Sequence, residues 1–151
     1  MAQSGRYAMR VDTEDLAAGQ RHLDRLLPHE DMLLQPYVDA IHSAGEISVV
    51  YVDGAVTHAV RKRSAGSDFR VHSDYGGSVT IEDPSPPLER VALAAVAALP
   101  EPVKYARVDL VEDVAMGPLV LEFEVVEPEL FFGASAAATE RFADAVVAFV
   151  R

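Results

Sequence analysis

Residues 47–61, which read ISVVYVDGAVTHAVR, decide the fold class of this chain. The dipeptide Asp53-Gly54 separates two runs that are rich in β-branched residues. Asp-Gly supplies the positive backbone angles that a type I′ turn requires, and such a turn joins two antiparallel strands. The stretch therefore predicts a β-hairpin with strands at residues 47–52 and 55–61.

A second hairpin is predicted around the turn sequence EDVAMG, with strands at residues 103–111 and 118–126. Successive side chains of a strand point to opposite faces. One face is apolar and should form core; its residues are Ala106, Val108, Leu110, Leu119, Leu121, Phe123 and Val125. The other face is charged; its residues are Arg107, Asp109, Glu122 and Glu124. Centring the turn near Ala115 places Asp109 across from about Leu121, with its carboxylate close to Glu122.

Helices complete the predicted fold. Asp12 or Thr13 can cap a first helix, which Pro28 ends. The remaining predictions are a buried strand at residues 32–38, a long loop at 64–78, and helices at 88–99 and 135–150, the last packing through Phe142, Val146 and Phe149. Because no crossover unit repeats, we expect a single α+β domain over residues 1–151, with a mainly antiparallel sheet and flanking helices.

The composition excludes several classes of function. A formal net charge of −11 argues against nucleic acid as a partner, because that binding depends on cations that displace phosphate counterions. No run approaches the roughly 18 apolar residues of a membrane span, and no export signal is present, so we expect a soluble cytoplasmic protein. The absence of cysteine excludes thiolate metal sites. One local basic cluster is a candidate anion site; it comprises Arg61, Lys62, Arg63 and Arg70.

The three acids of the second hairpin are the strongest chemical signal. Carboxylates within roughly 5 Å of one another repel by about 3 kcal/mol per pair at an effective dielectric near 20. A magnesium ion offsets this repulsion, since it binds carboxylate and phosphate oxygens. The alternative is a solvated outer face on which Arg107 screens three exposed acids. The five histidines show no helical pairing, so a zinc site is disfavoured.

Five segments in order resemble one known family. They are MLLQPYV at residues 32–38, GEISVVYVDGAVTHAVRK at 45–62, DFRVHSDYGGS at 68–78, YARVDLV at 105–111 and LEFEVVEP at 121–128. Together they resemble the ATP-grasp ligases of the glutathione synthetase and ribosomal-protein glutamate ligase type, and more closely the related enzymes of cycloserine biosynthesis. The resemblance implies an ATP-grasp carboxy-terminal subdomain.

The resemblance also implies roles for matching residues in nucleotide binding. The backbone around Gln35, Tyr37 and Val38 would pair with the adenine edge, and Glu46 would bind the ribose. Lys62 would face the phosphates of ATP. These residues form the expected nucleotide site.

The resemblance implies catalytic and metal roles as well. Arg70 would face the phosphates or an acyl-phosphate, and Arg107 would support the reacting groups beside the Mg²⁺ ligands Asp109, Glu122 and Glu124. The Tyr75-Gly76-Gly77 segment would line the acceptor pocket. The implied reaction activates a small-molecule carboxylate as an acyl-phosphate with ATP, after which an amine attacks.

Two features depart from the family pattern. The third metal position, Glu124 here, is often Asn in the glutathione synthetase branch. The family's upstream lid, with two lysines and a glycine-rich loop, has no match in this sequence. Residues 1–30 are expected to be the tail of the lid subdomain. Residues 31–151 are expected to be the nucleotide- and metal-binding region. The expected partner is a missing amino-terminal half or a second copy. The alternative is an oligomeric, non-catalytic module that binds a cation or a protein.

Overall fold

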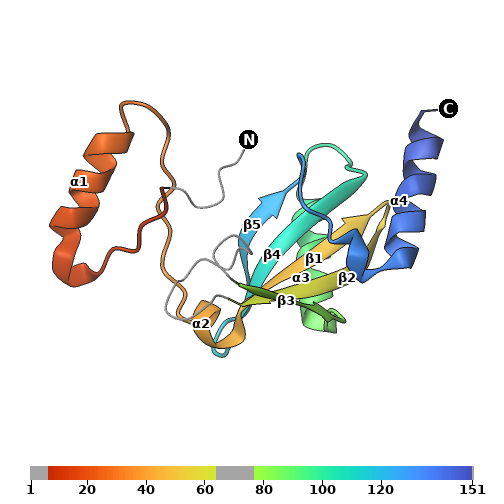
Figure 1. The fold of residues 1–151 in the computed structure, drawn as a ribbon, viewed down its shortest axis with the longest axis horizontal. Coiled ribbons are helices and arrows are strands. Elements are labelled where there is room, and N and C mark those ends of the chain that lie inside the picture. The colour runs from red at the N-terminus through yellow and green to blue at the C-terminus, as the bar shows by residue number, and fades with distance from the viewer. Residues whose placement is uncertain (1–6, 64–76, 151) are drawn as a thin grey trace. The chain divides into compact units, whose positions relative to one another are not determined.

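The computed structural model describes residues 7–63 and 77–150. Its contacts divide the chain into two compact units, Met1–Val38 and Asp39–Arg151. Figure 1 shows the elements of each unit. The predicted boundary at residue 30 lies inside the first unit, and the assignment of residues 1–30 to a lid subdomain stays a prediction.

The first unit contains a 3₁₀ turn, η1 (Thr13–Asp15), followed by helix α1 (Leu16–Leu26). The predicted cap at Asp12 or Thr13 is wrong. Asp15 caps the helix, since its Oδ1 accepts a hydrogen bond of 3.1 Å from the backbone N–H of Ala18. The amide of Asp15 donates to the carbonyl of Asp12 at 3.0 Å, so the first turn is 3₁₀ and the α-helix begins two or three residues later than expected. The helix ends before Pro28, as predicted.

The predicted buried strand at residues 32–38 is also wrong. Residues 31–38 have no regular secondary structure, and Leu33 and Leu34 are 86% and 82% exposed. No strand pairs with this segment among the described residues, and Pro36 lacks the N–H that a central strand would donate. An apolar run therefore did not suffice to predict a strand.

The second unit is built on a five-stranded sheet in the order β3-β2-β1-β4-β5, in which every neighbouring pair is antiparallel. The strands are β1 (Glu46–Val52), β2 (Ala55–Arg63), β3 (Ser78–Glu82), β4 (Tyr105–Asp113) and β5 (Gly117–Glu124). This confirms the predicted α+β class with a mainly antiparallel sheet. Strand β3 was missed, although Val79 and Ile81 alternate with polar residues in the way an edge strand does.

The two hairpin predictions are confirmed. Asp53 and Gly54 join β1 to β2 with φ of 43° and 94°, the left-handed values that the Asp-Gly turn predicted. In the second hairpin Asp109 pairs with Glu122 rather than with Leu121. A bulge between Asp109 and Leu110 absorbs Leu121 and shifts the register by one residue. Val120 therefore faces Leu110, Leu119 faces Val111, and the predicted place of Leu119 on the apolar face is wrong.

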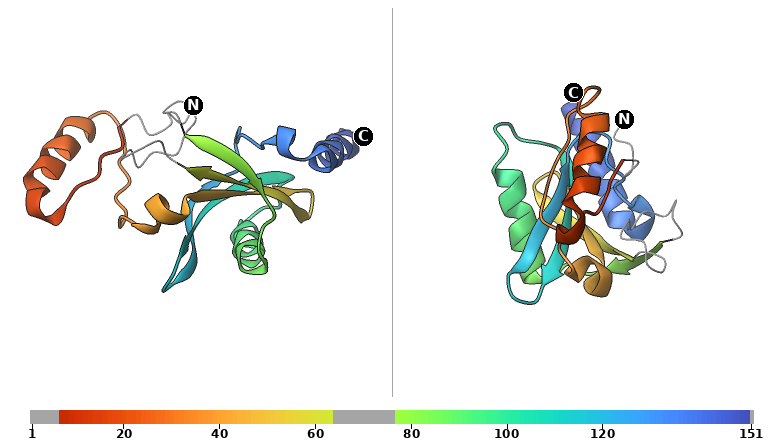
Figure 2. Two further views of the ribbon diagram at one scale, coloured as in Figure 1. Left: turned by 60° about the horizontal axis from the view of Figure 1, so that its bottom comes forward. Right: turned by 90° about the vertical axis from the view of Figure 1, so that its left-hand side faces the viewer.

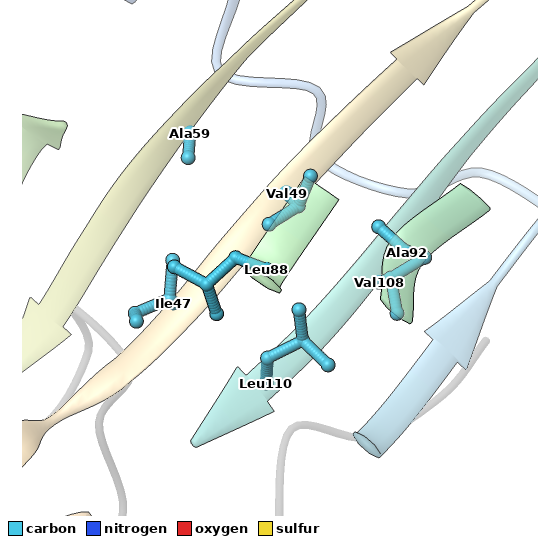
Figure 3. Packing of buried hydrophobic residues seen from close by; sticks show 7 residues of the cluster. All are labelled: Ile47, Val49, Ala59, Leu88, Ala92, Val108 and Leu110. Atoms are coloured by element: carbon cyan, nitrogen blue, oxygen red, sulfur yellow. The ribbon is translucent and has the colours of Figure 1, made fainter. Parts of the chain in front are cut away.

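Helices cover both faces of this sheet (Figure 2). Helix α3 (Pro86–Ala97) packs Leu88 and Ala92 on one face; the cluster there contains Ile47, Val49, Ala59, Leu88, Ala92, Val108 and Leu110 (Figure 3). Helix α4 (Ala136–Phe149), preceded by η3 (Phe132–Ala134), packs on the opposite face near Val50 and Val52. The short helix α2 (Ala40–Ala44) leads into β1.

The packing face of α4 differs from the prediction. Val146 and Phe149 are 45% and 76% exposed, whereas Ala138 and Ala145 are buried and Phe142 packs between the aromatic rings of Tyr105 and Phe132. Small alanines let the helix approach the sheet closely, so they occupy the contact instead of the larger residues. Across the residues that the structure describes, the helices are too short or too polar to cross a membrane.

Candidate functional site

The predicted nucleotide, metal and catalytic residues of the second unit that the structure describes lie on one face of the sheet, which we call the carboxylate face. Register places them in facing pairs, because directly opposite residues of paired strands share a face. The pairs are Glu46 with Lys62, Ser48 with Asp109, Asp109 with Glu122, and Arg107 with Glu124. The shared face predicted from alternation is therefore confirmed, and β1 extends it toward β2.

Asp109 is the most enclosed acid of this face. Its side chain is fully buried, and the hydroxyl of Ser48 donates to its Oδ1 at 2.5 Å. Arg107 donates from Nε to both carboxylate oxygens at 3.0 Å and from Nη2 to Oδ2 at 2.9 Å. This bidentate pair supplies the charge and the hydrogen bonds that a buried carboxylate requires.

The three predicted metal ligands converge on one atom, Nη2 of Arg107. That nitrogen lies 2.9 Å from Asp109, 2.8 Å from Glu124 and 3.9 Å from Glu122. Arg107 is itself only 6% exposed. The alternative of a solvated outer face is therefore wrong for Arg107 and Asp109, while Glu122 keeps about half of its side-chain surface in contact with water.

Lys62 and Glu46 extend the network toward β2. The ammonium of Lys62 forms an ion pair with Glu46 and lies 3.6 Å from Asp109. Burial raises the pKa of Glu46, and the charge of Asp109 raises it further, although Lys62 opposes both. Two of the residues expected to contact nucleotide are thus held together.

Electrostatic strain is greatest at Glu122. Burial, followed by repulsion from Glu124 and Asp109, raises the pKa of Glu122 to about 7. Burial lowers the pKa of Arg107, but the charges and hydrogen bonds of its acids outweigh that effect and leave the pKa raised. When all of these groups are ionised, four carboxylates face two cations here, which is an excess of two formal negative charges.

The charge and the oxygen donors of the carboxylate face are of the kind that magnesium prefers. Within residues 7–63 and 77–150, no group of three or more His, Asp or Glu side chains is already arranged to hold a metal. Magnesium is commonly held by one or two carboxylates together with nucleotide phosphates, so a complete protein cage is not required. Glu122 and Glu124 retain access to water, whereas both oxygens of Asp109 already accept hydrogen bonds. The metal role of the three acids stays a prediction.

The structure does not test the other predicted site residues. Arg70, Tyr75 and Gly76 fall outside the described residues, so their predicted roles stay predictions. Gln35, Tyr37 and Val38 belong to the first unit, where the guanidinium carbon of Arg10 lies 4.1 Å from the ring centroid of Tyr37. The adenine contact predicted for them stays a prediction too.

The prediction missed two parts of the arrangement. Ser48 was not singled out, although a lone polar residue in the apolar run of β1 was a signal. Arg61 was placed in a free basic cluster, but its guanidinium is engaged on the opposite face by Glu82 and Glu112. Alternation could have separated Arg61 from Lys62, since neighbouring residues of a strand point to opposite faces.

Known proteins resemble this chain over most of its length. The family described as "RimK-like ATP-grasp domain" matches residues 11–130. The cycloserine biosynthesis protein DcsG of Streptomyces lavendulae is 35% identical over 134 residues, which are 83% of this chain and 45% of DcsG. The crystal structure of D-cycloserine synthetase DcsG matches with a TM-score of 0.86 at 31% identity, covering 99% of this chain and 53% of that one.

A more distant structure shares the fold. D-alanine–D-alanine ligase from Bacillus anthracis, complexed with ATP, matches with a TM-score of 0.57 at 17% identity, covering 90% of this chain and 45% of that one. The chain thus spans about half the length of the relatives it matches.

Proposed function

This chain belongs to the RimK-like ATP-grasp family, and from that premise we propose that it provides the Mg-ATP side of a carboxylate–amine ligase. The observation that carries the proposal is the convergence of Asp109, Glu122 and Glu124 on Nη2 of Arg107. Two excess negative charges beside these groups match the charge of one divalent cation. The D-alanine–D-alanine ligase that shares this fold is described as complexed with ATP, which is consistent with a nucleotide ligand for this chain.

The proposed reaction is transfer of the γ-phosphoryl group of ATP to a small-molecule carboxylate, which releases ADP. An amine nitrogen then attacks the acyl carbon and forms the C–N bond, the C–O bond to phosphate breaks with its electron pair going to inorganic phosphate, and the nitrogen loses a proton. Such a transfer spreads negative charge over phosphoryl oxygens, so fixed cations and a bound metal supply most of the stabilisation.

The residues of the carboxylate face divide this work. Glu122 and Glu124 would hold Mg²⁺, with Asp109 behind them, and the ion would neutralise phosphate charge when bound. Arg107 is held in one orientation by Asp109, so its guanidinium is pre-organised beside the reacting groups. Lys62 is within reach of both Glu46 and Asp109, a position from which it can contact the phosphates while Glu46 accepts from the ribose hydroxyls.

The remaining half of such a ligase is proposed to act with this chain, in the same polypeptide or a second one. The relatives are about twice the length of the stretch they share with it. Full turnover would then need both halves, whereas binding of Mg-ATP to the carboxylate face can be tested on the chain as it stands.

Titration calorimetry with ATP, with and without MgCl₂, tests the proposal. We expect binding that depends on Mg²⁺ and that weakens about tenfold or more in Glu122→Gln, the range seen when groups at a metal site are altered. Glu101→Gln, which removes an exposed acid elsewhere in the unit, is the matched control and should bind like wild type.

Two outcomes would count against the proposal. One is binding that is equal with and without Mg²⁺, or equal in Glu122→Gln and wild type. The other is no heat from the chain alone and none after the amino-terminal half of an ATP-grasp relative is added in trans.

A further inference from the structure

The side chain of Arg61 uses all three of its nitrogens on the face of the sheet opposite the carboxylates. Its Nε and Nη2 each donate to Glu82 at 2.5 Å, which is a bidentate pair between β2 and β3. Nη2 also donates to Glu112 of β4 at 3.1 Å. The third nitrogen, Nη1, donates to the backbone carbonyl of Ala44 at 2.6 Å. Two acids therefore fix the orientation of a guanidinium that holds the carboxyl end of α2.

Helix α2 depends on such contacts. It has five residues, none of them buried, and Asp39 at its amino end makes no side-chain capping bond. Helices this short are not stable by themselves, because the entropy lost in fixing the first turn outweighs the stabilisation from the few hydrogen bonds of that turn. The bond from Arg61 to Ala44 is thus one restraint on where this helix ends, beside the bond from the N–H of Gly45 to the carbonyl of Ile41 and the contacts of α2 with β4.

The two residues after α2 transmit that restraint to the carboxylate face. Gly45 has φ of 77°, and a Cβ there would lie 2.5 Å from the carbonyl oxygen of Lys62, so the backbone passes directly against β2. Glu46 follows as the first residue of β1. It pairs with Lys62 on β2, but the register with β4 begins only at Ile47. The sheet therefore holds Glu46 from one side only.

We propose that Arg61 is a positioning residue that fixes the α2–β1 junction and thereby holds the carboxylate of Glu46 where it meets the sugar of a bound nucleoside triphosphate. Arg61 itself lies on the other face and contacts no ligand. This role rests on the proposed function, because it assigns to Glu46 the ribose contact of that same site. Arg61 should then matter for the nucleoside part of the ligand and not for its phosphates.

Hydrogen exchange and ligand titration of the full chain test this role in Arg61→Gln, Arg61→Lys and the control Arg90→Gln, which removes an exposed arginine of α3. In Arg61→Gln we expect residues 40–46 to exchange about tenfold faster, as for loss of one hydrogen bond to a charged group. Arg61→Lys should restore part of the protection, since an ammonium keeps the charge but not the forked geometry. Arg90→Gln should match wild type.

Titration with Mg-ATP and with magnesium tripolyphosphate separates positioning from general damage. We expect Arg61→Gln to weaken Mg-ATP binding several-fold while tripolyphosphate binds as to wild type. Equal weakening of both ligands, or unchanged exchange at residues 40–46, would overturn the role of Arg61. If wild type binds neither ligand, alone or with the amino-terminal half of an ATP-grasp relative added in trans, the proposed function fails, and the exchange data still decide whether Arg61 holds the junction.

Discussion

The two faces of the sheet each enclose one arginine, and the two arginines have different surroundings. Arg61 is paired with Glu82 and Glu112, whose side chains are 29% and 41% exposed, and with a backbone carbonyl. Arg107 is paired with Asp109, which has almost no contact with water, and two further acids compete for the same nitrogen. Both acids of the Arg61 cluster share their charge with solvent, whereas in the Arg107 cluster Glu122 and Glu124 do so and Asp109 does not.

This difference separates a structural ion cluster from one suited to ligand binding. On the Arg61 side, water compensates any charge left over by the protein. On the carboxylate face, two negative charges in excess of the cations persist beside a buried acid, and an added cation would relieve them. The following predictions test or sharpen that contrast, from the largest expected effect to the smallest.

Arg107→Gln should have the largest effect on stability. It leaves Asp109 buried without its bidentate partner, and breaking a buried ion pair costs about 3–5 kcal/mol of unfolding free energy. Urea unfolding, monitored by circular dichroism, measures this loss of unfolding free energy. A loss below about 1 kcal/mol would mean that Asp109 gains water or a proton at little cost and that the two faces do not differ as described.

Arg61→Gln should destabilise less. Its acids are partly exposed and regain water, so the loss is that of hydrogen bonds to a charged group, about 1–3 kcal/mol. The same unfolding assay applies, with Arg90→Gln as the control for removal of a positive charge. If Arg61→Gln proved more damaging than Arg107→Gln, the contrast between the faces would be reversed.

His58 should make stability fall in mild acid. It is buried at the end of the carboxylate face covered by α4, and its Nε2 donates to the carbonyl of Leu130 at 3.0 Å. Burial lowers the pKa of His58, although backbone hydrogen bonds to Leu130 and Phe131 oppose the shift. The unfolded chain therefore binds the proton more readily than the folded chain does.

The sign of the pH effect follows from that difference. The contribution of neutral His58 is complete above its unfolded pKa of about 6.5 and is lost as pH falls through the lowered folded value, by at most about 1.4 kcal/mol per pH unit. Melting temperatures between pH 5.5 and 8 should show a steeper fall for wild type than for His58→Gln. His29→Gln, which replaces an exposed histidine, should keep the wild-type slope.

Glu122→Gln should change stability least. Its carboxylate lies near two other acids and 3.9 Å from its cation, so removing the charge relieves repulsion, while half exposure keeps the gain within about 0.5 kcal/mol. The variant should lose most of the rise in melting temperature that MgCl₂ with ATP gives wild type. A clear destabilisation would show that Glu122 serves Arg107 as Asp109 does.

Much of the fold could be predicted because its signals are local. The Asp-Gly turn, the alternation of Arg107 and Asp109 with apolar residues, and helix α3 each depend on neighbours in sequence, although α3 begins two residues earlier than predicted because Pro86 and Pro87 are its first two residues. The failures at residues 32–38 and at α4 have another cause. An apolar run becomes a strand, and a helix face becomes buried, only when a partner is present to cover it.

The sequence predicted which residues form the candidate site better than it predicted their burial and contacts. Alternation identified Arg107, Asp109, Glu122 and Glu124 as one face, and register confirmed it. It did not predict that Arg107 and Asp109 are buried or that Ser48 contacts Asp109, because strand periodicity says nothing about which other strand lies alongside.

The sequence by itself determined two hairpins, their turns and the pairing of acids with a basic residue across the second hairpin, since all of these follow from period-two alternation and turn chemistry. Tertiary structure decided the rest by placing β1 beside β4 in the order β3-β2-β1-β4-β5. That non-local pairing brings Lys62 and Glu46 within reach of Asp109, and it places Glu112 beside Arg61, which strand alternation had already put on the other face. Contacts between distant hairpins depend on loop closure and packing, which no local pattern of residues encodes.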